Sequence, residues 1–192
     1  MAIRLEPLFI RKRPCVKDDL PMNILPYPDP FHLDAAVGWM MLGNHQEAVL
    51  ELGKLTPASR QEPDVLELEW SIHASAQQWD NALHTARMLM AVAPERPAAH
   101  VHQAYSLRRV TGGGLQRAYE ALLPAADKFP KESIIPYNLA CYTAQMGNLA
   151  EAWNWMIKAT ERAEPSGQIK KMALADPDLE PLWDRIRKEF LD

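Results

Sequence analysis

The chain has 192 residues, of which 47% are apolar and 24% charged, and its formal net charge is -4. These values are typical of a water-soluble protein, and the acidic balance excludes attraction of the whole chain to nucleic acid or anionic lipid. No run of about 18 apolar residues occurs, so the sequence predicts no membrane-spanning helix.

The two cysteines, Cys15 and Cys141, lie far apart in segments of different character. Such a pair does not indicate a disulfide framework, and a reducing compartment is therefore the default expectation. Residues 1–20 also lack the continuous apolar stretch of a signal peptide. We therefore predict a cytoplasmic protein.

Residues 1–29 are predicted to form an extended N-terminal arm, because repeated prolines remove backbone donors and disfavour a helix. The arm is apolar over residues 3–10, so we expect it to pack on the rest of the chain or on a neighbouring molecule. Arg11, Lys12 and Arg13 follow this stretch and are predicted to contact an acidic protein surface or anionic lipid. Three charges are too few for stable membrane anchoring, and a solvated arm is the alternative.

Helical patterns begin at residue 30. Apolar residues recur at helical spacing over residues 33–40, and Gly43-Asn44 ends this first helix. Pro124 predicts a kink or a late start in the sixth helix. The seventh and eighth helices are expected to meet at Gly147-Asn148. The second to sixth helices are expected at residues 47–55, 65–76, 79–93, 98–110 and 115–128.

Corresponding alanines stand at positions 48, 82, 118 and 152, which are 34, 36 and 34 residues apart. Three consecutive glycines, Gly112 to Gly114, account for the longer interval and are expected to form a flexible corner. A period of about 34 residues with two helices in each period resembles the tetratricopeptide repeat family. The residues that carry the best match are Leu139, Ala140, Thr143, Gly147, Leu149, Ala152 and Ala159.

This resemblance implies an all-α fold, a right-handed α-solenoid of four helical hairpins. The hairpins are expected at about 30–62, 63–96, 97–132 and 133–164. Residues 165–192 are predicted to form capping helices, with Asp176-Pro177 at a helix start, because a solenoid needs a cover for its last repeat.

In the tetratricopeptide repeat family, the first helix of each hairpin lines a concave groove, and the resemblance places the candidate partner-binding residues there. We expect an extended or helical peptide with an acidic anchor near Arg108 and Arg109. The alternative is that these arginines are solvated or paired with Glu120 or Glu95. Some family members clamp a C-terminal carboxylate, but Val101 and Tyr105 replace two of the residues that this clamp needs. The candidate partner-binding residues are Glu67, Val101, Tyr105, Arg108, Arg109, Tyr137 and Asn138 in the groove, and Arg11, Lys12 and Arg13 in the arm.

No combination of residues indicates catalysis, a metal or a cofactor. His100 and His102 are two residues apart, so they do not form the pair with a spacing of four that a helical zinc site uses. The triple glycine is not followed by the lysine of a phosphate-binding loop, and no base can be assigned to Cys141. We therefore predict a protein that is not an enzyme.

The predicted function is that of an adaptor or scaffold that binds a peptide or a filament subunit and no nucleic acid. Kinesin light chains belong to the same broad class of repeats, so a bacterial light-chain-like partner of tubulin-like filaments is one expectation. The alternative is a chaperone-like binder of an exported or membrane-associated client. The sequence leaves the oligomeric state open.

Overall fold

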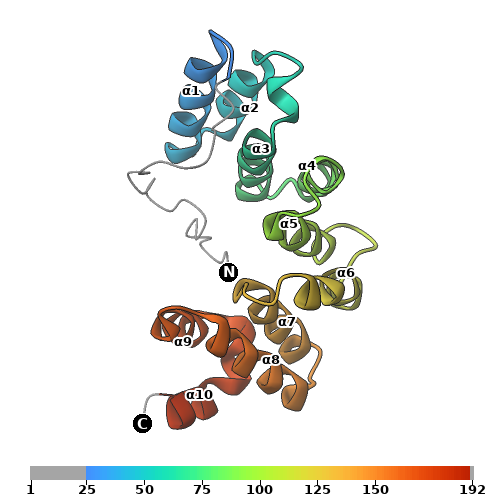
Figure 1. Cartoon of the computed structure of the whole chain (residues 1–192), viewed down its shortest axis with the longest axis vertical. Helices are drawn as coiled ribbons and strands as arrows, with labels where there is room; N and C mark the ends of the chain where they lie inside the picture. Colours follow the sequence, from blue (N-terminus) through green and yellow to red (C-terminus); the bar gives the residue numbers. More distant parts are fainter. Residues whose placement is uncertain (1–24, 191–192) are drawn as a thin grey trace. The chain divides into compact units, whose positions relative to one another are not determined.

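The computed structural model describes residues 25–190, and the N-terminal arm before Leu25 lies outside the described residues. Within residues 25–190 the chain forms ten α-helices and two short 3₁₀ helices, and no strand (Figure 1). The chain divides after Arg60 into two compact units. Among the described helices, none has both the length and the apolarity required to cross a bilayer.

The first compact unit holds one helical hairpin, formed by α1 (Asp29–Met41) and α2 (His45–Gly53). The corner residue Gly43 has a φ of 77°, and the next residue, Asn44, accepts a hydrogen bond from the backbone N–H of Glu47. This corner was predicted from the sequence, because glycine tolerates positive φ and asparagine caps a helix. Both predicted helices are confirmed.

Asp29 joins the start of α1 to the turn that follows α2. Its buried carboxylate accepts hydrogen bonds from the backbone N–H of Thr56 at 3.0 Å and from the Thr56 hydroxyl at 2.6 Å. Hydrogen bonds from Ser59 and Thr56 hold the pKa of Asp29 below its ordinary value. The hairpin is therefore closed at its open end by a charge-assisted contact.

The second compact unit contains three further hairpins and a C-terminal segment. Each hairpin packs on the next, and the first helices α3, α5 and α7 also lie next to one another. All six predicted helices are confirmed, and the late start expected from Pro124 is excluded because α6 begins at Leu115. The hairpin helices are α3 (Pro63–Ser75), α4 (Trp79–Val92), α5 (Pro97–Leu107), α6 (Leu115–Lys128), α7 (Ile134–Gln145) and α8 (Leu149–Arg162).

The triple-glycine corner between α5 and α6 is sterically constrained. Gly112 and Gly114 have positive φ values of 74° and 121°. A Cβ atom on Gly113 would lie only 1.9 Å from the carbonyl oxygen of Leu107, which accepts a hydrogen bond from the N–H of Gly114. The sequence predicted a flexible corner, whereas the structure shows that these glycines allow a close backbone crossing.

The C-terminal segment comprises α9 (Ser166–Ala175), η2 (Pro177–Leu182) and α10 (Trp183–Phe190). Asp176 caps η2 by accepting a hydrogen bond from the N–H of Asp178 at 3.0 Å, as the sequence predicted. The segment packs on α7 and α8. It buries Leu179, Leu182 and Ile186 in the core cluster that continues into α5–α8.

Candidate interaction site

The C-terminal segment covers the face of α7 on which the sequence placed partner-binding residues. Tyr137 and Asn138 are only 5% and 9% exposed. The Tyr137 hydroxyl donates to Asp176 Oδ2 at 2.8 Å, and Gln145 Nε2 donates to the backbone carbonyl of Asp178 at 3.0 Å. The capping segment therefore contacts Tyr137, as was expected of a partner, whereas Asn138 Nδ2 donates to the carbonyl oxygen of Ile134 within α7.

Arg108 forms an ion pair within the chain. Its guanidinium donates to both carboxylate oxygens of Asp178, with the Nη2–Oδ1 distance at 2.8 Å, and both side chains are less than 20% exposed. Burial lowers the pKa of Arg108, but the hydrogen bond and charge of Asp178 outweigh burial and raise it. The acidic partner of Arg108 is thus Asp178, and not Glu120 or Glu95, which the alternative interpretation of the sequence had named.

Cys141, Asp176 and Asp178 bring ligand atoms within 4.8 Å of one another at the same junction. Burial, together with the two aspartates, raises the pKa of Cys141 well above its ordinary value, so the thiol stays protonated. The thiol lies 3.6 Å from Asp176 Oδ2 as a hydrogen-bond donor, and Arg108 occupies both oxygens of Asp178. A metal requires a thiolate and available carboxylates, so this donor set fits a structural junction rather than a metal site.

Two other predicted residues are also engaged within the chain. Glu67 pairs with Arg96 at 3.1 Å, and Val101 is buried. Burial raises the pKa of Glu67 even though Arg96 lowers it. The Glu67 carboxyl is therefore a weaker acid than an exposed glutamate. Arg11, Lys12 and Arg13 lie outside the described residues.

A buried aromatic pair links α3 to α5. The rings of Trp70 and His102 are stacked with their centroids 3.7 Å apart, and Trp70 Nε1 donates to Ser106 Oγ at 2.9 Å. Burial lowers the pKa of His102 to about 3. His102 is therefore neutral at physiological pH and packs as an aromatic residue.

This histidine makes stability depend on pH. Between pH 6.5 and about 3, unfolded chains bind a proton at residue 102 that folded chains do not. We expect the free energy of unfolding to fall by about 1.4 kcal/mol per pH unit through this group as pH is lowered, or about 2 kcal/mol at pH 5. Urea titrations at several pH values give the free energy of unfolding of wild type and of His102→Phe as a function of pH. If this free energy changed equally with pH in the two proteins, the assignment would be contradicted. His84→Phe, at an exposed position, is the control.

Arg109 and Tyr105 are partly accessible, as are Glu67 and Arg108, whereas Val101, Tyr137 and Asn138 are buried. The Arg109 guanidinium carbon lies 3.6 Å from the ring centroid of Tyr105 and 4.9 Å from that of Trp79. An Arg109 Nη atom also donates to the carbonyl oxygen of Tyr105 at 3.1 Å. Burial is the main reason that the pKa of Arg109 is lowered, although a guanidinium keeps its charge near neutral pH. We call these three residues the Arg109 stack.

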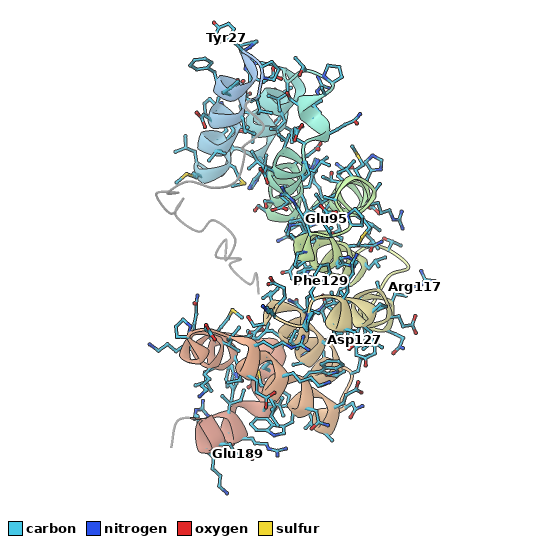
Figure 2. All side chains as sticks on the ribbon, viewed as in Figure 1. Tyr27, Glu95, Arg117, Asp127, Phe129 and Glu189 are labelled. Carbon is cyan, nitrogen blue, oxygen red and sulfur yellow. The ribbon has the colours of Figure 1, made fainter. Side chains whose placement is uncertain are left out.

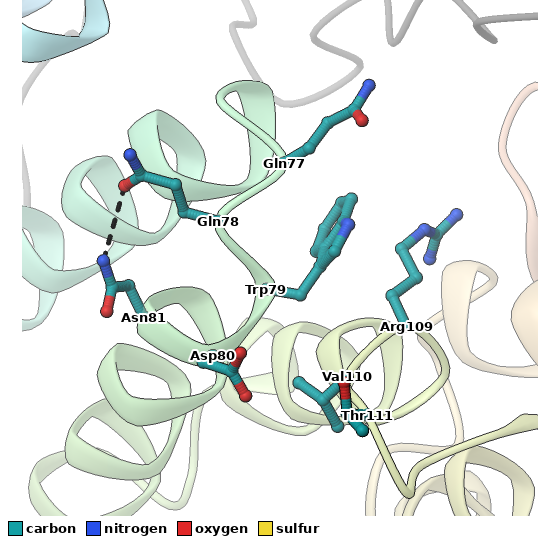
Figure 3. Close-up of a pocket in the computed structure, with 8 residues that line it drawn as sticks. All are labelled: Gln77, Gln78, Trp79, Asp80, Asn81, Arg109, Val110 and Thr111. Atoms are coloured by element: carbon teal, nitrogen blue, oxygen red, sulfur yellow. Dashed lines mark hydrogen bonds between the residues drawn. The ribbon is translucent and has the colours of Figure 1, made fainter.

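An open hollow of about 350 Å³ lies beside the Arg109 stack. Figure 3 shows the Trp79 ring and the Arg109 guanidinium next to each other. Asn81 Nδ2 donates a hydrogen bond to Gln78 Oε1 at 3.4 Å. The lining comes from the α3–α4 corner, the start of α4 and the chain just after α5. Its residues are Gln77, Gln78, Trp79, Asp80, Asn81, Arg109, Val110 and Thr111.

The sequence identified only part of this hollow. Arg109 was predicted to bind a partner, whereas no pattern in the sequence indicated Trp79 or Gln77. Gln77 adopts a φ of 57° at the corner position that Gly43 and Gly147 occupy in other hairpins. A polar residue in that backbone region is uncommon, so this departure from the repeat was a usable signal.

No known family model matches this sequence, and no curated protein is a detectable relative. Solved structures do resemble it. A crystal structure of MamA shares 16% identity and a TM-score of 0.61, covering 73% of this chain and 81% of that chain. MamA residues 41 to the end from Desulfovibrio magneticus RS-1 share 14% identity and a TM-score of 0.61, covering 85% and 94%.

A thermophilic TPR protein of Thermus thermophilus shares 16% identity and a TM-score of 0.58, covering 85% of this chain and all of that chain. At such identities the likeness concerns the fold. It confirms the predicted all-α solenoid of tetratricopeptide-like hairpins.

Proposed function

We propose that this chain is a non-catalytic protein-interaction module that binds a short peptide segment of a partner protein in the hollow beside the Arg109 stack. The observation that carries the proposal is the position of Arg109. It is the predicted groove arginine that lines a hollow, whereas Arg108 is engaged by Asp178. The tetratricopeptide-type fold supports a binding role by analogy.

The chemistry of the lining defines the peptide. Stacking on Tyr105 and Trp79 orients the Arg109 guanidinium, whose planar arrangement of donors suits a carboxylate. The amides of Gln77, Gln78 and Asn81 resemble the groups that bind an extended peptide backbone. Asp80 disfavours a run of acidic residues, so we expect one carboxylate next to an apolar residue that packs on the Trp79 ring.

The finer predictions from the sequence belong to this proposal. A filament subunit and an exported or membrane-associated client are both partner classes that could present such a segment. The cytoplasmic location, the absence of nucleic acid among the partners and a weak membrane contact of the arm stay predictions.

The proposal is tested with peptides selected from a displayed random library against the full chain. Binding of a selected peptide is measured by fluorescence anisotropy. Arg109→Gln is expected to weaken binding at least about tenfold, because a charge-assisted hydrogen bond contributes about 1.5–3 kcal/mol. The matched control is Arg185→Gln. Arg185, in the C-terminal segment, also stacks on an aromatic ring, because its guanidinium carbon lies 4.1 Å from the ring centroid of Trp153 in α8. A selected peptide that binds wild type and Arg109→Gln equally would refute the assignment of the hollow.

A further inference from the structure

Large apolar side chains are unusually exposed on α1 and at its two ends. Tyr27, Phe31, Met41 and Leu42 are 84%, 66%, 71% and 77% exposed, and Figure 2 shows Tyr27 projecting away from the ribbon. In the described part of the second compact unit, no large apolar side chain is more exposed than Val92, at 45%. A patch of this kind on one helix marks an interaction surface.

The composition of α1 fits a helix that is covered on more than one side. Its side toward α2 is closed by Ala36, which is fully buried. A surface helix of a monomeric protein normally carries charged residues on its opposite side, and a terminal repeat of a solenoid needs a polar outer face. The α1 sequence, Asp29–Met41, contains no lysine, arginine or glutamate, and Asp34 is its one exposed charged side chain.

Gly38 is an independent indication of a close neighbour. A glycine within a helix destabilises it by about 0.5–1 kcal/mol relative to alanine. A Cβ atom at Gly38 would meet no described atom within 4 Å, and the residue does not need positive φ. Neither a turn nor a contact within the described chain therefore explains this glycine, whereas close approach of another helix would.

The spacing of the exposed residues is symmetric about the middle of α1. Phe31 and Leu42 are placed at equal distances outside Ala35 and Gly38. At about 100° per residue these four positions lie within a stripe about 60° wide on the helix. If two α1 helices cross antiparallel about a two-fold axis, each Phe31 lies opposite Leu42 of the other copy, and each Ala35 lies opposite Gly38.

We propose that a second copy of this chain docks on this stripe through antiparallel pairing of the two α1 helices. A large side chain exposes about 200 Å² when fully accessible, so the fractions at Tyr27, Phe31, Met41 and Leu42 leave about 600 Å² on each copy. Phe31 and Leu42 lie on the stripe, and Tyr27 and Met41 lie beside it. Two copies that also cover Tyr27 and Met41 bury about 1,200 Å², which is the lower limit for a specific interface. The small residues Ala35 and Gly38 let the two helices approach closely, and the large residues pack at either end.

The oligomeric state of the full chain tests the proposal. Sedimentation equilibrium between about 1 and 200 µM is expected to show a monomer–dimer equilibrium, which Gly38→Leu shifts at least about tenfold toward monomer. Leucine has the better helix propensity, so this variant should fold as well as wild type. Gly53→Leu is the matched control, because a side chain there also meets no described atom within 4 Å.

Two further variants test the antiparallel register. Phe31→Lys and Leu42→Glu should each be monomeric alone, and an equimolar mixture should form a mixed dimer. In the mixed dimer, the lysine at position 31 of one copy faces the glutamate at position 42 of the other and forms an ion pair. The second contact keeps the wild-type residues Leu42 and Phe31. A wild-type monomer at the highest concentration, or a dimer unaffected by Gly38→Leu, would overturn the proposal. The proposal would also be overturned if the full chain were a monomer but a chain starting at Met22 formed a dimer. In that case the N-terminal arm, and not a second copy, would cover the stripe in the full chain.

Discussion

Replacing Gly113 by alanine is expected to lower the free energy of unfolding by about 3 kcal/mol. The new Cβ would stand 1.9 Å from the carbonyl oxygen of Leu107 and 2.9 Å from that of Val110, and both are backbone atoms that cannot rotate away. The corner must therefore open, which breaks the 3.0 Å hydrogen bond from Gly114 N–H to Leu107. Urea denaturation followed by circular dichroism measures the change.

Gly112→Ala is the control for this prediction. Gly112 has a φ of 74°, but a Cβ there would meet nothing within 4 Å. Alanine at this position should lower the free energy of unfolding by only about 1 kcal/mol, because its side chain is strained in the left-handed conformation. Equal losses in the two variants would show that the close crossing contributes nothing.

Replacing Arg108 by methionine is expected to lower the free energy of unfolding by about 3 kcal/mol. The substitution leaves the Asp178 carboxylate, which is 17% exposed, without the guanidinium that binds both of its oxygens. Removing one partner of a buried pair is costly because the other charge stays desolvated. Thermal and urea unfolding measure the loss.

The double variant Arg108→Met with Asp178→Leu separates this charge effect from packing. It should come within about 1 kcal/mol of wild type, since no uncompensated charge remains. Arg185→Met is the exposed counterpart, and loss of its pair with Glu189 should cost about 0.5 kcal/mol. If the double variant were as unstable as Arg108→Met, the loss would come from packing of the arginine stem rather than from the unpaired carboxylate.

The hairpins were predictable because their signals are local. Apolar spacing places the helices, and corner pairs such as Gly43-Asn44 and Gly147-Asn148 combine a residue that adopts positive φ with a side chain that caps the next helix. Each signal acts over a few residues and recurs with the repeat. The helix ends therefore follow the sequence closely, although α5 ends at Leu107 rather than at the expected Val110.

The candidate site was only partly predictable because its contacts are long-range. Arg108 and Asp178 are separated by 70 residues, and no pattern near either residue indicates the other. The sequence therefore assigned Arg108 to a partner molecule. Trp79 and Arg109 belong to consecutive hairpins, so the hollow that they line depends on how those hairpins stack. Its lining could be found only from the structure.

The dependence of the α5–α7 surface on the C-terminal segment has a consequence for synthesis of the chain. At about 5–20 residues per second, a ribosome needs about 4–14 s to extend the chain from Arg108 to Asp178. Arg108 is made at the start of that interval and Tyr137 and Cys141 during it, whereas the carboxylates that they contact are made only at its end. A nascent chain therefore exposes this surface until the capping segment leaves the exit tunnel, and in this interval a chaperone would find its binding site.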